Sequence, residues 1–430
     1  MTARLRGFVS QHPARIGVLG AVLLLLGGSW YQATITPPYR FIDEQAHVGY
    51  VLAIQSATLP DIDTPIDQAA GGEELRRRLA VEPERRQDVW VANNPPLTYV
   101  VAAGPAALTR ALGLPGGPLL GLRLVNVAAA GGAVALTYLL ARDLAGGDQT
   151  VGLVAAGTLA AVPHLGFVAS LGFNDGMALL VSTGVLVSLA RLCGAGDPGP
   201  PARHIRHLGI WCALAAATRP MSLAWALDAG MIALAVVWWR RSAKVIWTAA
   251  WLALPTVLVA GWYYVLSVVR YGDPTGSATL FEKFGREPTG SLWSSLRLTS
   301  VWESAYRTLF TRRLEMPLPT DPYSWYRIAL WIAIAAALVA TFLVVRSAVA
   351  QRGGARGPND LPVVAWLAMV AMAVVPFVLV AQHRAGGGAP HPRYLLPAVP
   401  ILVAAVALAV VQVGTRWGGL ALVLVLAAAT

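Results

Sequence analysis

Long apolar runs separated by short polar connections make up most of the chain. About 20 apolar residues in a helix cross the hydrocarbon core of a bilayer, and eleven runs approach or reach that length. We predict membrane spans near residues 16–33, 119–141, 150–169, 175–193, 207–218, 221–239, 245–267, 326–347, 361–381, 395–414 and 417–430.

A further apolar run, 96–112, is also long enough for a short span, and counting it would invert every later loop. Short cytoplasmic loops of membrane proteins are enriched in Arg and Lys. The basic clusters at 191–206, 240–244 and 346–356 share the cytoplasmic side only if 96–112 does not cross. We therefore expect 96–112 to be a juxtamembrane or re-entrant helix on the outer side, and the N-terminus to be cytoplasmic.

The composition supports this interpretation. Of the 430 residues, 56% are hydrophobic and only 13% are charged, and the mean hydropathy is +0.58. Soluble domains are about 25% charged, so an ordinary soluble enzyme is excluded. The predicted fold class is all-α, a polytopic transmembrane helical protein of about eleven spans. The net charge of +11 comes from the basic cytoplasmic loops, so the expected partner is the lipid bilayer and not a nucleic acid.

The polar stretch after the first span is acidic. Residues 34–95 carry ten carboxylates against six arginines, a net charge of −4, and an acidic segment of a basic membrane protein belongs outside. Within it, the segment around 73–88 resembles a charged surface helix. The chain is thus expected to divide into a cytoplasmic N-terminus with the first span (1–33), an outer loop with juxtamembrane helices (34–118), a transmembrane core (119–267), a second large outer loop (268–325) and C-terminal helices (326–430).

Unusual polar residues gather at the predicted outer face. Asp43 follows the first span beside Phe41 and Ile42, and a partly desolvated carboxylate there can act as a general base toward an acceptor hydroxyl. Three arginines lie at the outer ends of spans and can hold a lipid-linked phosphate, because the planar guanidinium makes bidentate contacts. They are Arg123, Arg219 and Arg393.

The ordered set of motifs resembles the GT-C superfamily of polyprenyl-phosphate-sugar glycosyltransferases, in its protein O-mannosyltransferase and aminoarabinose transferase branch. Each motif alone is weak, but together they extend over nearly the whole chain in the order of the family. They are Asp43-Glu44-Gln45-Ala46-His47, Asn94-Pro95-Pro96-Leu97, Arg123-Leu124-Val125-Asn126, Asn174-Asp175, Thr218-Arg219 and Arg393-Tyr394-Leu395-Leu396-Pro397.

The resemblance implies that Asp43 is the base of an inverting transfer, that Glu44 supports it and that Asp175 is the second acidic position. From the residues themselves, we expect Arg123, Arg219 and Arg393, with Tyr394, to bind the donor phosphate, and His47 and Asn94 to support the site. The family typically has a lysine at position 219 and a histidine at position 94. These departures leave the class unchanged but leave the donor sugar undetermined.

Simpler roles exist for several of these residues. Asp175 can cap the fourth span, and His47, which shares a helix face with Asp43, can be structural. Arg219 and Arg393 can be interfacial arginines whose heads reach water. The seven histidines show no metal-ligand spacing, so no metal site is predicted, and a divalent cation stays an open alternative.

The leading hypothesis is a plasma-membrane glycosyltransferase. It would move a hexosyl or pentosyl group from a polyprenyl-phosphate donor to a hydroxyl of a cell-envelope glycan, lipid or protein on the outer face. A transporter or lipid-linked sugar flippase is the alternative of another class, although transporters tend to place polar residues at the midplane and to show internal repeats. An O-antigen-ligase-like enzyme is a third alternative, disfavoured by the early acidic loop.

Overall fold

The structure is a computed structural model. It describes residues 13–41, 43–79, 87–195, 202–242, 244–299, 302–303, 308–309, 325–352 and 362–412. Within these ranges the chain is helical and forms no strand beyond one isolated bridge between Pro65 and Asp88. The predicted all-α fold class is confirmed.

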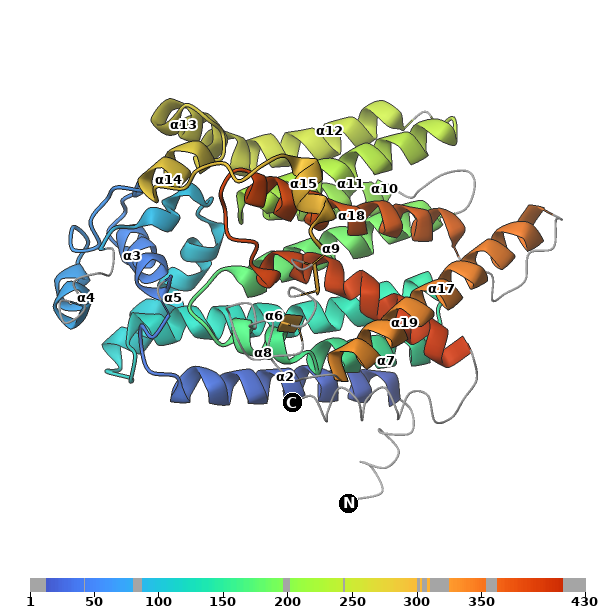
Figure 1. Cartoon of the computed structure of the whole chain (residues 1–430), viewed down its shortest axis with the longest axis horizontal. Helices are drawn as coiled ribbons and strands as arrows, with labels where there is room; N and C mark the ends of the chain where they lie inside the picture. Colours follow the sequence, from blue (N-terminus) through green and yellow to red (C-terminus); the bar gives the residue numbers. More distant parts are fainter. Residues whose placement is uncertain are drawn as a thin grey trace, which may run out of the picture.

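Long helices run side by side along the molecule (Figure 1). These helices are α2 (Pro13–Ile35), α6 (Pro118–Leu144), α7 (Gln149–Ala160) with α8 (Pro163–Ala169), α9 (Asp175–Gly194), α10 (Ala202–Ala216), α11 (Pro220–Trp239), α12 (Val245–Thr256) continuing through η2 (Val257–Gly261) into α13 (Trp262–Tyr271), α17 (Trp325–Arg352), α18 (Val363–Ala385), and η3 (Pro392–Ala398) with α19 (Val399–Gln412).

Ten of the eleven predicted spans coincide with these helices, and the run 417–430 lies outside the described residues. Seven described helices are long and apolar enough to cross a membrane, or eight if α7 and α8, bent by 62° at their junction, form one span. The protein is therefore a multi-pass membrane protein, while the total of eleven spans stays a prediction.

Local sequence sets several helix boundaries. Pro118 and Pro220 begin α6 and α11, where a missing backbone N–H costs no hydrogen bond. The Asp148 side chain caps α7 by accepting from the amides of Thr150 and Val151. Gly272 ends α13 in the left-handed conformation, which suits glycine.

Helices α6 and α9 form the centre of the bundle. Small residues bring the helix backbones together there, as is usual between membrane helices. A Cβ atom at Gly121 would collide with the backbone of Pro105 and Ala106, and one at Gly176 would collide with Asn126. Helix α6 therefore packs closely against both α9 and α5 (Leu97–Ala111).

One end of the bundle is covered by short elements (left in Figure 1). These are α3 (Glu44–Gln55), α4 (Gly72–Leu79), η1 (Trp90–Asn93), α5 and α14 (Ser277–Lys283). The segments 34–118 and 268–325 meet here, since the Lys283 ammonium lies 2.6 Å from the Asp63 carboxylate and 3.0 Å from that of Asp88.

The predicted surface helix around 73–88 is present in its first part, since α4 covers Gly72–Leu79. Residues 80–86 lie outside the described residues, and Asp88 pairs with Pro65 in an isolated bridge that is flanked by hydrogen bonds between the two segments. The charge pattern did not reveal this, because charged residues alternate in a similar way in a surface helix and in an exposed loop. Helix α5 does occupy the predicted 96–112 segment.

Candidate functional site

Four charged residues occupy helix starts at this end of the bundle. Asp43 immediately precedes α3, and Asp175 is the first residue of α9. Arg219 immediately precedes Pro220 at the start of α11, and Arg393 lies in the first turn of η3, after Pro392. Residues far apart in the sequence are brought together because their helices begin at the same end.

The four side chains form one continuous chain of opposite charges. The Arg393 guanidinium donates to an Asp43 carboxylate oxygen at 2.7 Å and lies 3.8 Å from Asp175. The Arg219 guanidinium donates to Asp175 at 2.9 Å and also to the side-chain oxygen of Asn174. The formal charges of the four residues sum to zero, so this charged cluster is electrically balanced.

The members of the charged cluster differ in accessibility. The Asp175 side chain is 1% exposed, those of Arg219 and Arg393 are 12% exposed, and that of Asp43 is 21% exposed. Among the described residues, only one carboxylate oxygen of Asp43 has a hydrogen-bond partner. Among the four, Asp43 is thus the carboxylate that an approaching hydroxyl can reach.

Aromatic rings enclose Arg393. Its guanidinium lies 4.9 Å from the ring centre of Phe173 and 5.5 Å from that of Tyr394, which are favourable cation–π distances. Its Nε atom is buried without a hydrogen-bond partner. Tyr394 also lines a small cavity with Arg219, Ser222 and Trp225. At least one N–H donor of Arg393 therefore has no acceptor among the described residues.

Glu44 and Arg123 form a separate pair that does not join the charged cluster. The Arg123 side chain is 3% exposed and that of Glu44 is 0% exposed. The guanidinium donates to both Glu44 oxygens and to the carbonyls of Ala33, Thr36 and Pro37. All five N–H groups of Arg123 are therefore used within the protein, and none remains for a phosphate.

This pair ties together the end of α2, the start of α3 and the loop before α9. The Gly172 amide donates to Glu44 at 2.9 Å. Burial raises the pKa of the Glu44 carboxyl, and the Arg123 guanidinium and the Gly172 amide oppose that rise. Glu44 and Arg123, both predicted as functional, therefore form a buried pair next to Asp43 in the chain.

Asn126 holds the loop that carries Asp175. Its side-chain NH₂ donates to the carbonyls of Val168, Ala169 and Leu171, and its oxygen accepts from the Gly176 amide at 2.6 Å. Asn126 is 1% exposed. A single amide from α6 thus fixes both sides of the turn that precedes α9.

His47 lies beside the charged cluster on α3, whereas Asn94 directly follows η1. The His47 ring is buried, with Nδ1 2.9 Å from the Tyr99 hydroxyl and its centre 5.5 Å from that of Phe173. Asn94 does not contact the four charges. The side-chain NH₂ of Asn94 donates to the Val91 carbonyl, and the backbone carbonyl of Asn94 accepts from the Tyr50 hydroxyl.

Two contact residues were missed by sequence reasoning, Tyr99 and Phe173. Both adjoin predicted motifs: Tyr99 follows Asn94-Pro95-Pro96-Leu97 by two positions, and Phe173 precedes Asn174-Asp175. Aromatic residues are common near membrane interfaces, so residue type alone did not distinguish them from an aromatic belt.

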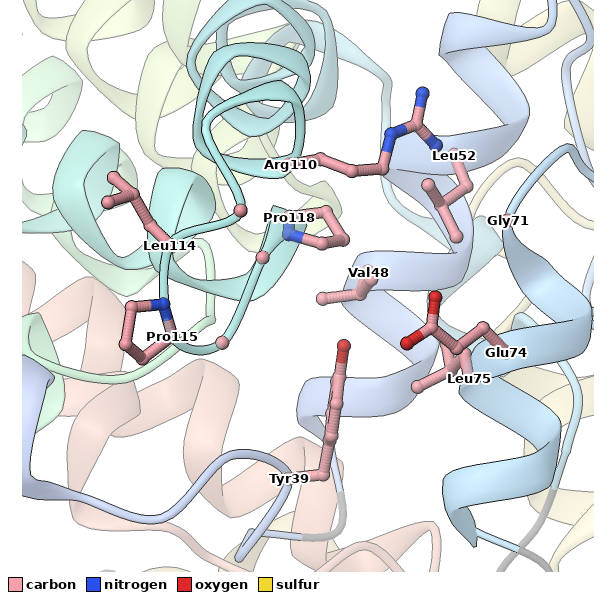
Figure 2. A pocket seen from close by; sticks show the side chains of 13 residues that line it. Tyr39, Val48, Leu52, Gly71, Glu74, Leu75, Arg110, Leu114, Pro115 and Pro118 are labelled. Atoms are coloured by element: carbon pink, nitrogen blue, oxygen red, sulfur yellow. The ribbon is translucent and has the colours of Figure 1, made fainter.

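A separate cavity of about 370 Å³ lies on another face of α3. Val48 and Leu52 form its floor, and Figure 2 shows the Tyr39 ring and the Glu74 carboxylate bordering the space opposite Pro115 and Pro118. The turn Gly113–Pro118 between α5 and α6 completes the wall. This volume is in the range of small-molecule sites.

Among the described residues, no group of three or more His, Cys, Asp or Glu side chains has a geometry that could hold a metal ion. No metal ligands are assigned in the charged cluster.

No protein-family model matches the chain, and no curated protein matches it. Solved structures do. The oligosaccharyltransferase AglB of Archaeoglobus fulgidus, in complex with an inhibitory peptide and a dolichol-phosphate, matches with a TM-score of 0.50 and 14% identity, over 98% of this chain and 55% of its own. The same enzyme tethered to an acceptor peptide matches with a TM-score of 0.51 and 14% identity, over 98% and 54%. The chain has a GT-C fold.

ArnT of Cupriavidus metallidurans bound to undecaprenyl phosphate matches with a TM-score of 0.43 and 14% identity, over 92% of this chain and 77% of its own. The chain spans about half the length of the AglB oligosaccharyltransferase. Identity of 14% shows the GT-C fold alone, and the fold predicted from the ordered motifs is confirmed.

Proposed function

We propose that this GT-C-fold protein is a glycosyltransferase that moves a sugar from a polyprenyl-phosphate donor to a hydroxyl of a cell-envelope acceptor, on the outer face of the plasma membrane. The observation that carries the proposal is the balanced chain Asp43–Arg393–Asp175–Arg219 at one end of the helical bundle. The structure of AglB with a dolichol-phosphate and a peptide supports a lipid-phosphate donor on this fold.

The reaction is a single displacement. The acceptor oxygen attacks the anomeric carbon of the sugar while its proton passes to the open oxygen of Asp43. The bond between the anomeric carbon and the phosphate oxygen breaks, and the polyprenyl phosphate leaves with the electron pair. Attack from the opposite side inverts the anomeric centre.

The two arginines stabilise the departing phosphate. The Arg393 and Arg219 side chains are each 12% exposed, and Arg219 is held at the start of α11. Arginine paired with phosphate gives charge-assisted hydrogen bonds about twice as strong as neutral ones. Asp175 contacts Arg219 and lies near Arg393, so we assign it the role of positioning both guanidinium groups. Arg123 and Glu44 hold the scaffold, and Tyr394 borders the phosphate site.

Acceptor recognition falls to the elements at the same end of the bundle. The cavity of Figure 2 lies wholly within residues 39–118. Its lining combines a carboxylate, a guanidinium and a phenol with apolar side chains. We propose that part of the acceptor contacts this cavity while its hydroxyl reaches Asp43.

The test compares wild-type protein with Asp43→Asn, each reconstituted in lipid with a panel of polyprenyl-phosphate sugars and a cell-envelope extract. The measured quantity is release of free polyprenyl phosphate. Asp63→Asn is the matched control, because the Asp63 side chain is 75% exposed and belongs to the same segment. Loss of a general base typically costs about 10²–10⁴-fold in rate, so we expect that loss for Asp43→Asn and near wild-type release for the control.

Equal release by wild type and Asp43→Asn would remove Asp43 from the mechanism. Movement of the lipid-linked sugar across the bilayer, without release of polyprenyl phosphate, would instead indicate the flippase alternative.

A further inference from the structure

His47 lies within the electric field of the whole charged cluster. It is one helical turn after Asp43 on α3 and is 4% exposed. Four charged side chains act on its ring: Asp43 on its own helix, Arg393 on η3, Asp175 on α9 and Arg219 at the start of α11. The Phe173 ring contacts both the His47 ring and the Arg393 guanidinium. His47 thus lies next to the proposed phosphate site.

Tyr99 determines which nitrogen of the ring carries the proton. The Tyr99 hydroxyl is fully buried, is 2.9 Å from Nδ1 and has no other hydrogen-bond partner among the described residues. Burial raises the pKa of Tyr99 well above its usual value, so the hydroxyl keeps its hydrogen. If Nδ1 donated, the hydroxyl hydrogen would be buried without an acceptor, which is unfavourable. The hydroxyl therefore donates to Nδ1.

With Nδ1 as acceptor, the neutral ring carries its hydrogen on Nε2. Burial lowers the pKa of His47 to about 4, so the ring is neutral at physiological pH. The Nε2 atom has no hydrogen-bond partner among the described residues. A fixed N–H donor thus remains unused beside two arginines and two carboxylates.

We propose that the Nε2–H group of neutral His47 donates a hydrogen bond to a phosphate oxygen of the polyprenyl-phosphate donor, and that Tyr99 is a positioning residue which fixes this tautomer. The proposal rests on the proposed function, because it deepens the role of the same site.

Charge balance favours a phosphate oxygen as the acceptor. The formal charges of the four side chains sum to zero, so they do not neutralise the added negative charge of a bound phosphate. Hydrogen bonds to charged groups are stronger than neutral ones. A neutral donor supplies such a bond without repelling Arg219 and Arg393, which a protonated imidazole would do. His47 then acts like other neutral imidazoles that donate a hydrogen bond to a substrate oxygen and stabilise its negative charge.

The first experiment measures the affinity of the purified full chain for undecaprenyl phosphate, a probe that carries no sugar. The variants are His47→Leu, which removes the donor, and His47→Gln, whose side-chain amide can place an N–H near the position of Nε2. We expect about tenfold or more weaker binding by His47→Leu and recovery to within about threefold of wild type by His47→Gln. Thermal unfolding of each variant shows whether it is folded.

The second experiment records ¹⁵N spectra of wild-type and Tyr99→Phe protein labelled at histidine, with His47→Gln used to assign the signal. The wild-type signal at pH 7 is expected to be that of a neutral ring protonated at Nε2, and Tyr99→Phe is expected to lose this single tautomer. A purely structural contact would not produce this signature together with weaker phosphate binding.

The outcomes separate the two proposals. Failure of wild-type protein to bind undecaprenyl phosphate would overturn the proposed function and this inference with it. Wild-type binding that His47→Leu retains in full would overturn only the inference. A wild-type ring protonated at Nδ1, or charged at pH 7, would also overturn it, and so would binding that depends on His47 only when a sugar is attached.

Discussion

Variants of the buried Glu44–Arg123 pair test whether these two residues stabilise the fold without binding the donor phosphate. Both side chains are almost completely inaccessible, and the pair also holds three carbonyls and the Gly172 amide. Replacing one partner of such a pair leaves an uncompensated buried charge, at a cost of about 3–5 kcal/mol. We therefore expect Glu44→Gln to lower the free energy of unfolding by about 3 kcal/mol or more.

The double variant Glu44→Gln/Arg123→Met removes both charges. Replacing both members of a buried pair by uncharged groups is often close to neutral, although here the three carbonyls lose their donor. We expect the double variant to be destabilised by clearly less than the sum of the two single changes. Equilibrium unfolding in mixed micelles measures all three values and yields the coupling energy.

The contacts of Arg123 also predict a result for donor binding. If Arg123 has no donor left for a phosphate, the double variant at a temperature where it is folded should bind undecaprenyl phosphate within about threefold of wild type. A loss of affinity as large as that of Arg393→Met would refute the separation of this pair from the phosphate site. A stability of Glu44→Gln equal to wild type would refute the structural role.

Three further predictions follow from other contacts. Lowering the pH from 7 to 4.5 should destabilise wild type more than His47→Gln. The pKa of His47 is about 4 in the folded state and 6.5 in the unfolded chain, so the unfolded chain takes up the proton first, and the free energy of unfolding falls by about 1.4 kcal/mol per pH unit. Equal slopes of unfolding free energy against pH for the two proteins would contradict this. Asn126→Ala removes four hydrogen bonds and should cost about 2–4 kcal/mol in unfolding free energy and weaken undecaprenyl phosphate binding through Asp175. Val48→Trp should fill the cavity of Figure 2 and raise KM for the cell-envelope extract about tenfold without changing undecaprenyl phosphate affinity; an unchanged KM would exclude the cavity from acceptor binding.

The membrane spans could be predicted because the lipid bilayer, and not specific side-chain contacts, sets their length and composition. A bilayer requires apolar helices of a certain length, so runs of apolar residues mark the spans, and prolines such as Pro118 and Pro220 mark where helices begin. The gathering of Asp43, Asp175, Arg219 and Arg393 at one end also followed from topology, since all four adjoin the same ends of their spans.

The pairing within the site could not be predicted in the same way. Arg123, Arg219 and Arg393 appeared equivalent, because each is near the start of a span. The structure separates them by depth: Arg123 is in the second turn of α6, whereas Arg219 immediately precedes α11 and Arg393 is in the first turn of η3. Which carboxylate an arginine meets depends on packing between helices, and the Glu44–Arg123 pair is set by how α3 folds back onto α6.

The position of the charged cluster explains how an anion can enter it. Helix N-termini favour negative charge because the helix dipole places partial positive charge there, and Asp43 and Asp175 occupy the starts of α3 and α9. In the structure these carboxylates satisfy the arginines. We infer that a phosphate oxygen takes the place of a carboxylate oxygen beside the arginines. The arginines have already lost most of their water in these ion pairs, so donor binding does not require their desolvation. Asp43 then loses its ion pair with Arg393 as the phosphate arrives. Donor binding thus leaves both carboxylate oxygens of Asp43 available to the acceptor hydroxyl.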